Sequence, residues 1–96
     1  MSKFGIEKNP YDFLAELALR HKAVRKQMSL SQSQLAQRSG VSLGSIKRFE
    51  QTGKISLESL LKTVQILNHL SDFELILKPT DNLKAIEKLF SDKTRV

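Results

Sequence analysis

The sequence predicts an all-α domain followed by a short C-terminal β-strand and a final helix. Three observations predict this fold. Apolar residues recur every three or four positions through most of the chain, the periodic segments begin at capping residues, and the period changes to alternation only at residues 73–78. We therefore expect an N-terminal arm at residues 1–8, a helical domain over 9–71, the strand and last helix over 72–90, and a tail at 91–96.

The first helix is expected to begin at Asn9, whose side chain can cap it, with Pro10 at the first helical position. An inward-facing stripe follows, consisting of Leu14, Leu17, Ala18, His21, Val24 and Met28. A second helix starts at Ser31, which forms a capping box with Gln34, and stops at Gly40.

The third helix is expected to run from a cap at Ser42 to a stop at Gly53, and the fourth to start at Ser56. The fourth helix has the strongest apolar stripe, made of Leu57, Leu60, Leu61, Val64 and Leu67. Alternating apolar residues then predict a strand that ends at Pro79. A last helix is expected within 82–90, with an apolar face of Leu83, Ile86, Leu89 and Phe90.

The positive charge of the chain is concentrated in one segment. The net charge is +6, and residues 20–54 hold eight bases and one acid, Glu50, which gives 8 − 1 = +7. The flanking segments sum to −1 and 0. This distribution favours a polyanionic partner, and the alternative is a basic surface that only keeps the protein in solution.

The composition argues against an enzyme or a metalloprotein. The chain has no cysteine, and its two histidines, His21 and His69, are far apart without a cluster of acidic residues. We expect both histidines to be satisfied or exposed, with no catalytic residue, metal or cofactor. No apolar run approaches the roughly 20 residues that span a bilayer. The expectation is a soluble, cytoplasmic, nucleoid-associated protein without a membrane partner.

The second and third helices predict a helix-turn-helix. Leu35 and Ala36 point inward from the second helix, while Ile46 and Phe49 anchor the third. Two helices joined by so tight a turn cross steeply, which leaves the outer face of the third helix free to enter a DNA groove. The alternative is a helical hairpin that serves packing or protein contact.

Residues 32–42, together with Ile46 and Phe49, resemble the helix-turn-helix of the phage-repressor and Cro superfamily of XRE-type regulators. The resemblance covers roughly residues 14–70. It implies a lambda-repressor-like DNA-binding domain of four to five helices that represses transcription. Three departures blur the reading code: Ser39 stands where the family usually has an apolar residue, Gly44 lies inside the third helix, and one residue is added before Gly53.

Candidate base contacts lie on the exposed face of the third helix. Lys47 and Arg48 can donate to guanine O6 and N7, and Leu43 can contact a thymine methyl group. The full set is Ser42, Leu43, Gly44, Lys47, Arg48 and Gln51.

The candidate phosphate contacts are Lys22, Ser31, Gln32 and Lys54. The resemblance implies that Gln32 binds phosphate and braces the third helix, and that Ser31, Ser42 and Lys54 hold the DNA backbone. Lys22 and Lys26 flank the duplex or are simply solvated.

Arg25 and Glu50 occupy positions that form a partly buried ion pair in several relatives of the family. The alternative is two independent surface charges.

The strand predicted at residues 73–78 has no partner within the chain, so we expect it to pair across a homodimer through Phe73, Leu75 and Leu77. The alternative is an extended tail. A repressor domain followed by such a strand is similar in layout to HipB-type antitoxins, which bind a kinase-fold toxin.

The resulting hypothesis is a dimeric repressor that binds a palindromic double-stranded operator, favoured as the antitoxin of a HipA/HipB-like module that autoregulates its operon. The alternatives are a stand-alone XRE-type regulator and a helical protein-interaction module that does not bind DNA.

Overall fold

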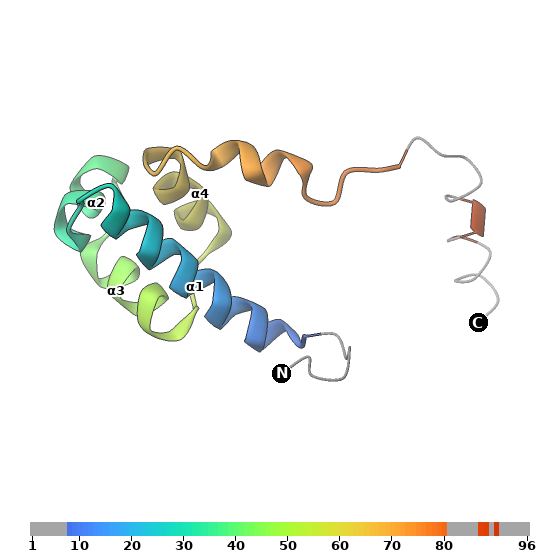
Figure 1. Ribbon diagram of the computed structural model, residues 1–96, viewed down its shortest axis with the longest axis horizontal. Helices are drawn as coiled ribbons and strands as arrows, with labels where there is room; N and C mark the ends of the chain where they lie inside the picture. The colour runs from blue at the N-terminus through green and yellow to red at the C-terminus, as the bar shows by residue number, and fades with distance from the viewer. Residues whose placement is uncertain (1–7, 81–86, 89, 91–96) are drawn as a thin grey trace.

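The computed structural model describes residues 8–80, 87, 88 and 90, and this part of the chain contains helices and no strand. Figure 1 shows the order of the elements along the chain. They are α1 (Pro10–Gln27), α2 (Gln32–Ser39), α3 (Leu43–Thr52), α4 (Leu57–Ile66) and a short 3₁₀-helix, η2 (Leu70–Leu75). The predicted helical domain is confirmed.

The helix starts lie where the capping residues predict them. The Asn9 side chain accepts the Asp12 N–H at 2.8 Å, and Ser31 forms the expected capping box with Gln34. Ser42 and Ser56 each accept the N–H three residues later, at 3.1 Å. These bonds satisfy N–H groups that have no partner within their own helix.

Two glycines end helices at the predicted positions, in a conformation that other residues rarely adopt. Gly40 ends α2 with φ +78° and Gly53 ends α3 with φ +81°. Gly53 has a second reason to be glycine, because a Cβ there would lie 3.1 Å from the backbone of Leu14. At this point α1 and α3 touch through their main chains.

The core consists of two apolar clusters that meet along α1. One cluster joins the helix-turn-helix to α4 and contains Leu30, Leu35, Val41, Ile46 and Leu67. The other joins α1, α3 and α4 and contains Ala18, Phe49, Leu60 and Val64. His21 lies on α1 between Ala18 and Val24, which pack in or against different clusters.

The strand predicted at residues 73–78 is wrong, because Leu70–Leu75 forms η2 instead. A lone strand cannot satisfy its backbone within one chain, whereas a 3₁₀-helix closes its own i→i+3 hydrogen bonds. The segment also has a second apolar period, since Leu70, Phe73 and Ile76 recur every three residues and share one side of such a helix. Phe73 packs against Ala18, Phe49, Leu60 and Val64 as a half-buried residue.

Two residues of the predicted inward stripes face solvent instead. Met28 is 42% exposed and Leu57 is 66% exposed, because each lies at the end of its helix, where the stripe runs past the core. The predicted last helix lies largely outside the described residues; Glu87, Lys88 and Phe90 are described and are helical.

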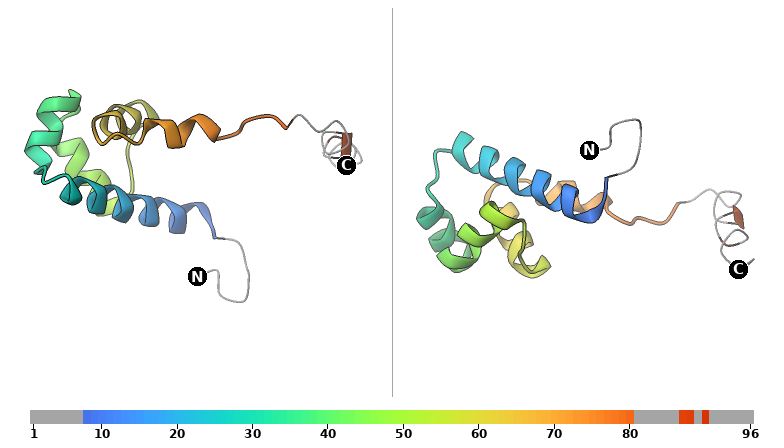
Figure 2. Two further views of the ribbon diagram at one scale, coloured as in Figure 1. Left: turned by 45° about the horizontal axis from the view of Figure 1, so that its top comes forward. Right: turned by 90° about the horizontal axis from the view of Figure 1, so that it is seen from below.

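After η2 the chain turns at Ile76 and Leu77 and then leads away from the helices to Thr80, as two further views also show (Figure 2). Within the part of the chain that the structure describes, no helix is long and apolar enough to span a bilayer.

Candidate nucleic-acid interface

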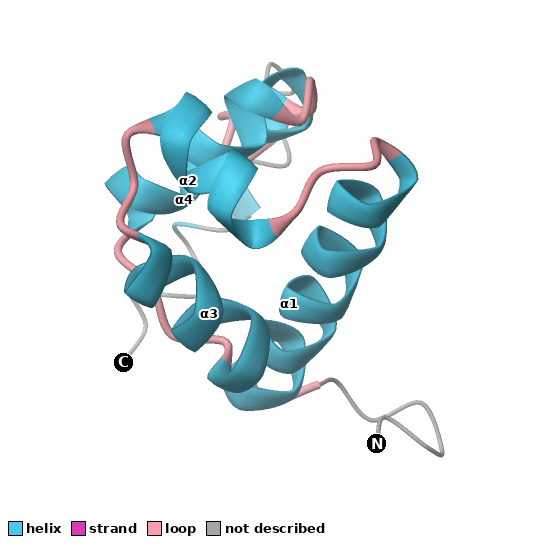
Figure 3. Cartoon of the chain, turned by 90° about the vertical axis from the view of Figure 1, so that its left-hand side faces the viewer, coloured by secondary structure: helices cyan, strands magenta, loops and turns pink. Residues whose placement is uncertain are grey.

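Helix α3 is held firmly on one side and is open on the other. Ile46 and Phe49 have no exposed surface, so they fix the inner face of the helix. The sequence-predicted residues of the opposite face are exposed, with the exception of half-buried Leu43; they are Gly44, Lys47, Arg48 and Gln51. The helix therefore presents two cations and an amide to solvent on a rigid support. Figure 3 shows the backbone of α3 beside that of α1.

Two of the candidate base contacts have particular local roles. Ser42 is exposed, but its hydroxyl caps α3 by accepting the Ser45 N–H and also donates to the Ser45 hydroxyl at 2.8 Å. At Gly44, an added Cβ would meet nothing within 4 Å on the protein. The glycine therefore leaves room for another molecule to approach the backbone closely.

The basic segment remains strongly cationic at the surface. Its only acid, Glu50, is enclosed with Arg25, so no acid of the segment itself is exposed; outside the segment, Glu16 pairs with Arg20. The seven other bases (8 − 1 = 7) are all exposed, and they are Arg20, Lys22, Lys26, Arg38, Lys47, Arg48 and Lys54. Such a surface attracts a polyanion.

Arg48 and Lys54 are brought together at the junction of α3 and α4. They line a hollow of about 270 Å³ with Ile55 and the hydroxyl-bearing residues Ser45, Ser56 and Ser59. Lys54 is placed there by the turn after α3, where its N–H donates to the Thr52 hydroxyl. The structure thus joins one predicted base contact and one predicted phosphate contact in a single cationic hollow.

The ion pair expected between Arg25 and Glu50 is present. Nε and Nη2 of Arg25 donate to the two carboxylate oxygens of Glu50 at 2.9 and 2.8 Å, while Nη1 donates to the Leu30 carbonyl oxygen at 2.8 Å. This bidentate ion pair links α1 to α3. The bond from Nη1 of Arg25 also holds the loop between α1 and α2 at Leu30.

Gln32 lies where it can brace α3, because its side-chain amide donates to Glu50 at 3.1 Å. Ser31 caps α2, and both Lys22 and Lys54 are exposed.

His21 is a buried member of this network, a role that the sequence analysis missed. Its Nδ1 lies 3.0 Å from Glu50, and its Nε2 lies 3.0 Å from the hydroxyl of Thr63 on α4. The only signal in the sequence was a histidine in the apolar stripe of α1, matched by a threonine inside the apolar stripe of α4. In the described part of the chain, no buried side-chain nitrogen or oxygen lacks a hydrogen-bond partner.

Burial shifts the pKa values of Glu50 and His21, and the hydrogen-bond partners of each group oppose that shift. Burial alone raises the pKa of the Glu50 carboxyl, but hydrogen bonds from Arg25 and Gln32 and the charge of Arg25 bring it below its usual 4.5. Burial lowers the pKa of His21 below 6.5, and the hydrogen bond and charge of Glu50 oppose this shift without cancelling it. At neutral pH the carboxylate is therefore ionised.

The helix-turn-helix family model matches residues 22–75, more than half of the chain. The chain belongs to the XRE-type helix-turn-helix family. The family is one of DNA-binding transcriptional regulators, and α2 and α3 form the motif that names it. No curated protein and no solved structure matches the chain.

Proposed function

We propose that this XRE-type regulator is a sequence-specific repressor that places α3 in the major groove of its operator. The observation that carries the proposal is the outer face of α3, which is exposed and cationic while its inner face is immobilised by Ile46, Phe49 and Glu50. Arg48 and Lys47 are the candidates for reading guanine, Leu43 for a thymine methyl group, and Gln51 for a further base edge.

The DNA backbone is proposed to be held on both sides of α3. Lys54 lies beside Arg48 in the hollow between α3 and α4, which suits a phosphate oxygen. Gln32, Ser31, Ser42 and Lys22 are retained as further phosphate contacts.

The test is selection of a duplex from random-sequence DNA by the wild-type protein, followed by titration of variants against that duplex. Arg48→Ala is expected to weaken binding by about 1–3 kcal/mol and to relax the base preference at one position. Lys54→Ala is expected to weaken all sequences similarly and to lower the salt dependence of binding. Lys62→Ala, which removes an exposed base on α4 outside the basic segment, is the control. Failure to select any sequence contradicts the proposal.

We also propose that the repressor binds as a homodimer through the apolar side chains around η2. Leu75 and Leu77 are 71% and 95% exposed, and burial of such side chains favours association. To reach two successive major-groove sites, the two α3 helices of such a dimer have to lie about 34 Å apart.

The structure changes the choice of residues for testing the dimer. Phe73 belongs to the core of its own domain, so a charged residue there would disturb folding as well as association. Leu75→Lys and Leu77→Lys together are expected to give monomers in sedimentation. Leu57→Lys, at an equally exposed leucine on α4, is expected to leave the mass of the dimer unchanged.

The antitoxin hypothesis depended on the strand predicted at residues 73–78. Because η2 occupies the first half of that segment and a turn follows it, the reason for preferring an antitoxin no longer holds. We therefore propose a regulator that acts without a toxin, and co-purification of a kinase-fold protein with the tagged chain would overturn this choice.

A further inference from the structure

Glu50 receives as many hydrogen bonds as its carboxylate can accept. Arg25 supplies two, Gln32 supplies one, and His21 supplies the fourth. A carboxylate offers about four lone-pair sites, so these donors occupy all of them. The side chain of Glu50 is only 3% exposed, and water therefore cannot easily replace a missing donor.

Glu50 is one of the inner-face residues, with Ile46 and Phe49, that fix how α3 is turned about its axis. Lys47 and Gln51 are its neighbours on the helix three residues before and one residue after, and both face solvent. Because successive residues are about 100° apart around an α-helix, a small rotation at Glu50 moves each exposed side chain sideways. The donors to Glu50 therefore control where the outer face points.

His21 is itself held from three helices. Its backbone belongs to α1, its Nε2 meets Thr63 on α4, and its ring packs edge-on against Phe49 of α3, with centroids 4.9 Å apart. The ionised carboxylate only accepts hydrogen bonds, so Nδ1 of His21 carries the proton in the bond to Glu50. The Thr63 hydroxyl lies 3.0 Å from Nε2 and donates its own proton to the Leu60 carbonyl oxygen at 2.8 Å.

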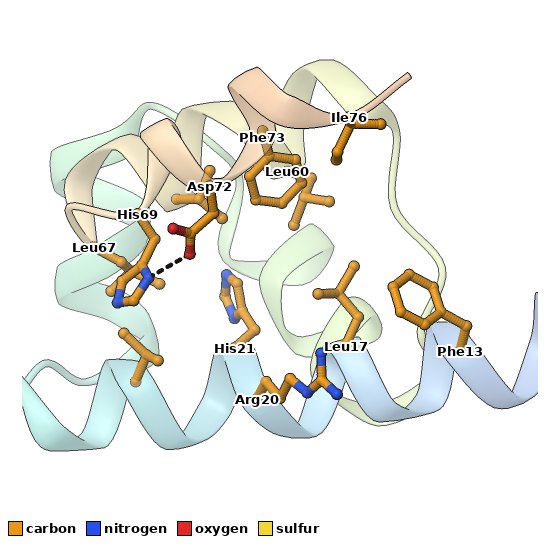
Figure 4. A pocket seen from close by; sticks show the side chains of 12 residues that line it. Phe13, Leu17, Arg20, His21, Leu60, Leu67, His69, Asp72, Phe73 and Ile76 are labelled. Carbon is orange, nitrogen blue, oxygen red and sulfur yellow. Dashed lines mark hydrogen bonds and ion pairs between the residues drawn. The ribbon is translucent and has the colours of Figure 1, made fainter. Parts of the chain in front are cut away.

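A groove of about 450 Å³ between α1, α4 and η2 reaches the His21 ring (Figure 4). Its walls are mainly apolar, and its charged groups are tied in pairs. Arg20 pairs with Glu16, and His69 pairs with Asp72 across the groove from His21. The groups that face His21 directly are therefore Glu50 and the adjacent Arg25.

We propose that His21 is a positioning residue for DNA recognition, which fixes Glu50 through Nδ1 and thereby sets the orientation of α3 against the duplex. This inference rests on the proposed function of α3. Replacing His21 alone leaves the buried Glu50 carboxylate without its fourth donor, so stability has to be measured beside DNA affinity.

Three substitutions of His21 distinguish the effect of its hydrogen bond to Glu50 from the effect of filling the buried position. Asn places its amide nitrogen near the position of Nδ1 and keeps the donor toward Glu50, without a titratable ring. Gln places its nitrogen near Nε2, which directs it toward Thr63. Leu removes both bonds and keeps an apolar volume. His21→Asn and His21→Gln are therefore a matched pair of buried amides.

The experiment measures the affinity of each variant for the duplex that the wild-type protein selects from random DNA, beside its unfolding free energy in urea. His21→Leu and His21→Gln are expected to bind the selected duplex roughly fivefold or more weakly. The loss of binding free energy is then part of what one charge-assisted hydrogen bond contributes. His21→Asn is expected to stay within about twofold of wild type. Binding to random-sequence DNA is expected to change little in all three variants.

Equal affinities for His21→Asn and His21→Gln overturn the inference, as does an affinity that simply follows stability across the series. If His21→Leu proves too unstable to measure, the two amide variants still decide the question. Failure of the wild-type protein to select any duplex counts against the proposed function instead, so the two failures are distinct.

Discussion

Charged side chains usually face solvent and apolar ones usually lie inside, but the inner face of α3 and the end of η2 show the opposite arrangement. At α3 a carboxylate, a guanidinium and an imidazole are enclosed together, with Glu50 only 3% exposed. At η2 the apolar Leu75 and Leu77 face solvent. The difference teaches that hydrophobicity alone does not decide burial. A charged group can lie inside when every one of its bonds is satisfied, and an apolar group stays outside when no described part of the chain covers it.

The two regions also differ in what a substitution should cost. Substitutions in the α3 region should cost much stability, because each buried polar atom depends on a partner and the main chains of α1 and α3 are in contact. The η2 region contributes little to the fold of a single copy. Substitutions in the two regions therefore test this contrast, beginning with the largest expected effect.

Glu50→Ala is expected to lower the unfolding free energy by about 3–5 kcal/mol, because it leaves Arg25 buried without its counter-charge. Urea denaturation measures the change. Glu58→Ala, which removes an exposed acid on α4, is expected to change stability by less than about 0.5 kcal/mol. The double variant Arg25→Met/Glu50→Leu should recover much of the loss, and additive single effects would contradict the buried pair.

Gly53→Ala is expected to cost about 2 kcal/mol or more, because it combines a left-handed backbone with a close approach to Leu14. Gly40→Ala is the matched comparison, since its φ is nearly the same but an added Cβ meets nothing within 4 Å. It should cost only about 1 kcal/mol, the conformational part of the effect. Equal losses would show that the contact between α1 and α3 is not tight.

Acid should weaken the fold through His21. Its pKa in the folded protein lies below the ordinary 6.5, so the unfolded chain binds more protons as the pH falls below that value. Stability is therefore full above pH 6.5 and declines toward the folded pKa, by at most about 1.4 kcal/mol per pH unit from this one group. Unfolding free energies of wild type and His21→Asn between pH 7.5 and 5 measure the effect, and the difference between their profiles should disappear if His21 does not titrate.

Glu50 gives a second, lower window with the same sign. Because its folded pKa lies below 4.5, its contribution is present above that pH and is lost as the pH falls through the folded value. The Glu50 window begins at a lower pH than the His21 window, because the ordinary pKa values are 4.5 and 6.5.

The smallest effect is expected at η2. Leu77→Ser should change the stability of the monomer by less than about 0.5 kcal/mol, because the side chain is almost fully exposed. The measurement is made at a protein concentration low enough to exclude association. Phe73→Ser should cost several times more, since Phe73 packs in the core. A large loss at Leu77 would show that the exposed segment supports the fold of its own copy.

Much of the helical domain could be predicted from local signals. Asn9, Ser31, Ser42 and Ser56 cap helices as expected, and Gly40 and Gly53 end them. Such signals are readable because a cap or a stop depends on residues only a few positions apart. The pair of Arg25 and Glu50 was expected from the family resemblance and not from spacing.

The prediction failed where a segment depends on partners distant in the chain. Alternation at residues 73–78 predicted a strand, yet η2 forms because its backbone finds bonds within itself and Phe73 finds a place in the core. His21 and Thr63 are 42 positions apart, so no local pattern could join them.

By itself, the sequence determined where the helices begin and end, where the positive charge gathers and which motif the chain contains, since these follow from neighbouring residues and composition. Only the tertiary structure decided which charged groups are enclosed and which apolar side chains are left outside. That choice depends on whether packing brings four donors to one carboxylate, and packing is a property of the whole domain.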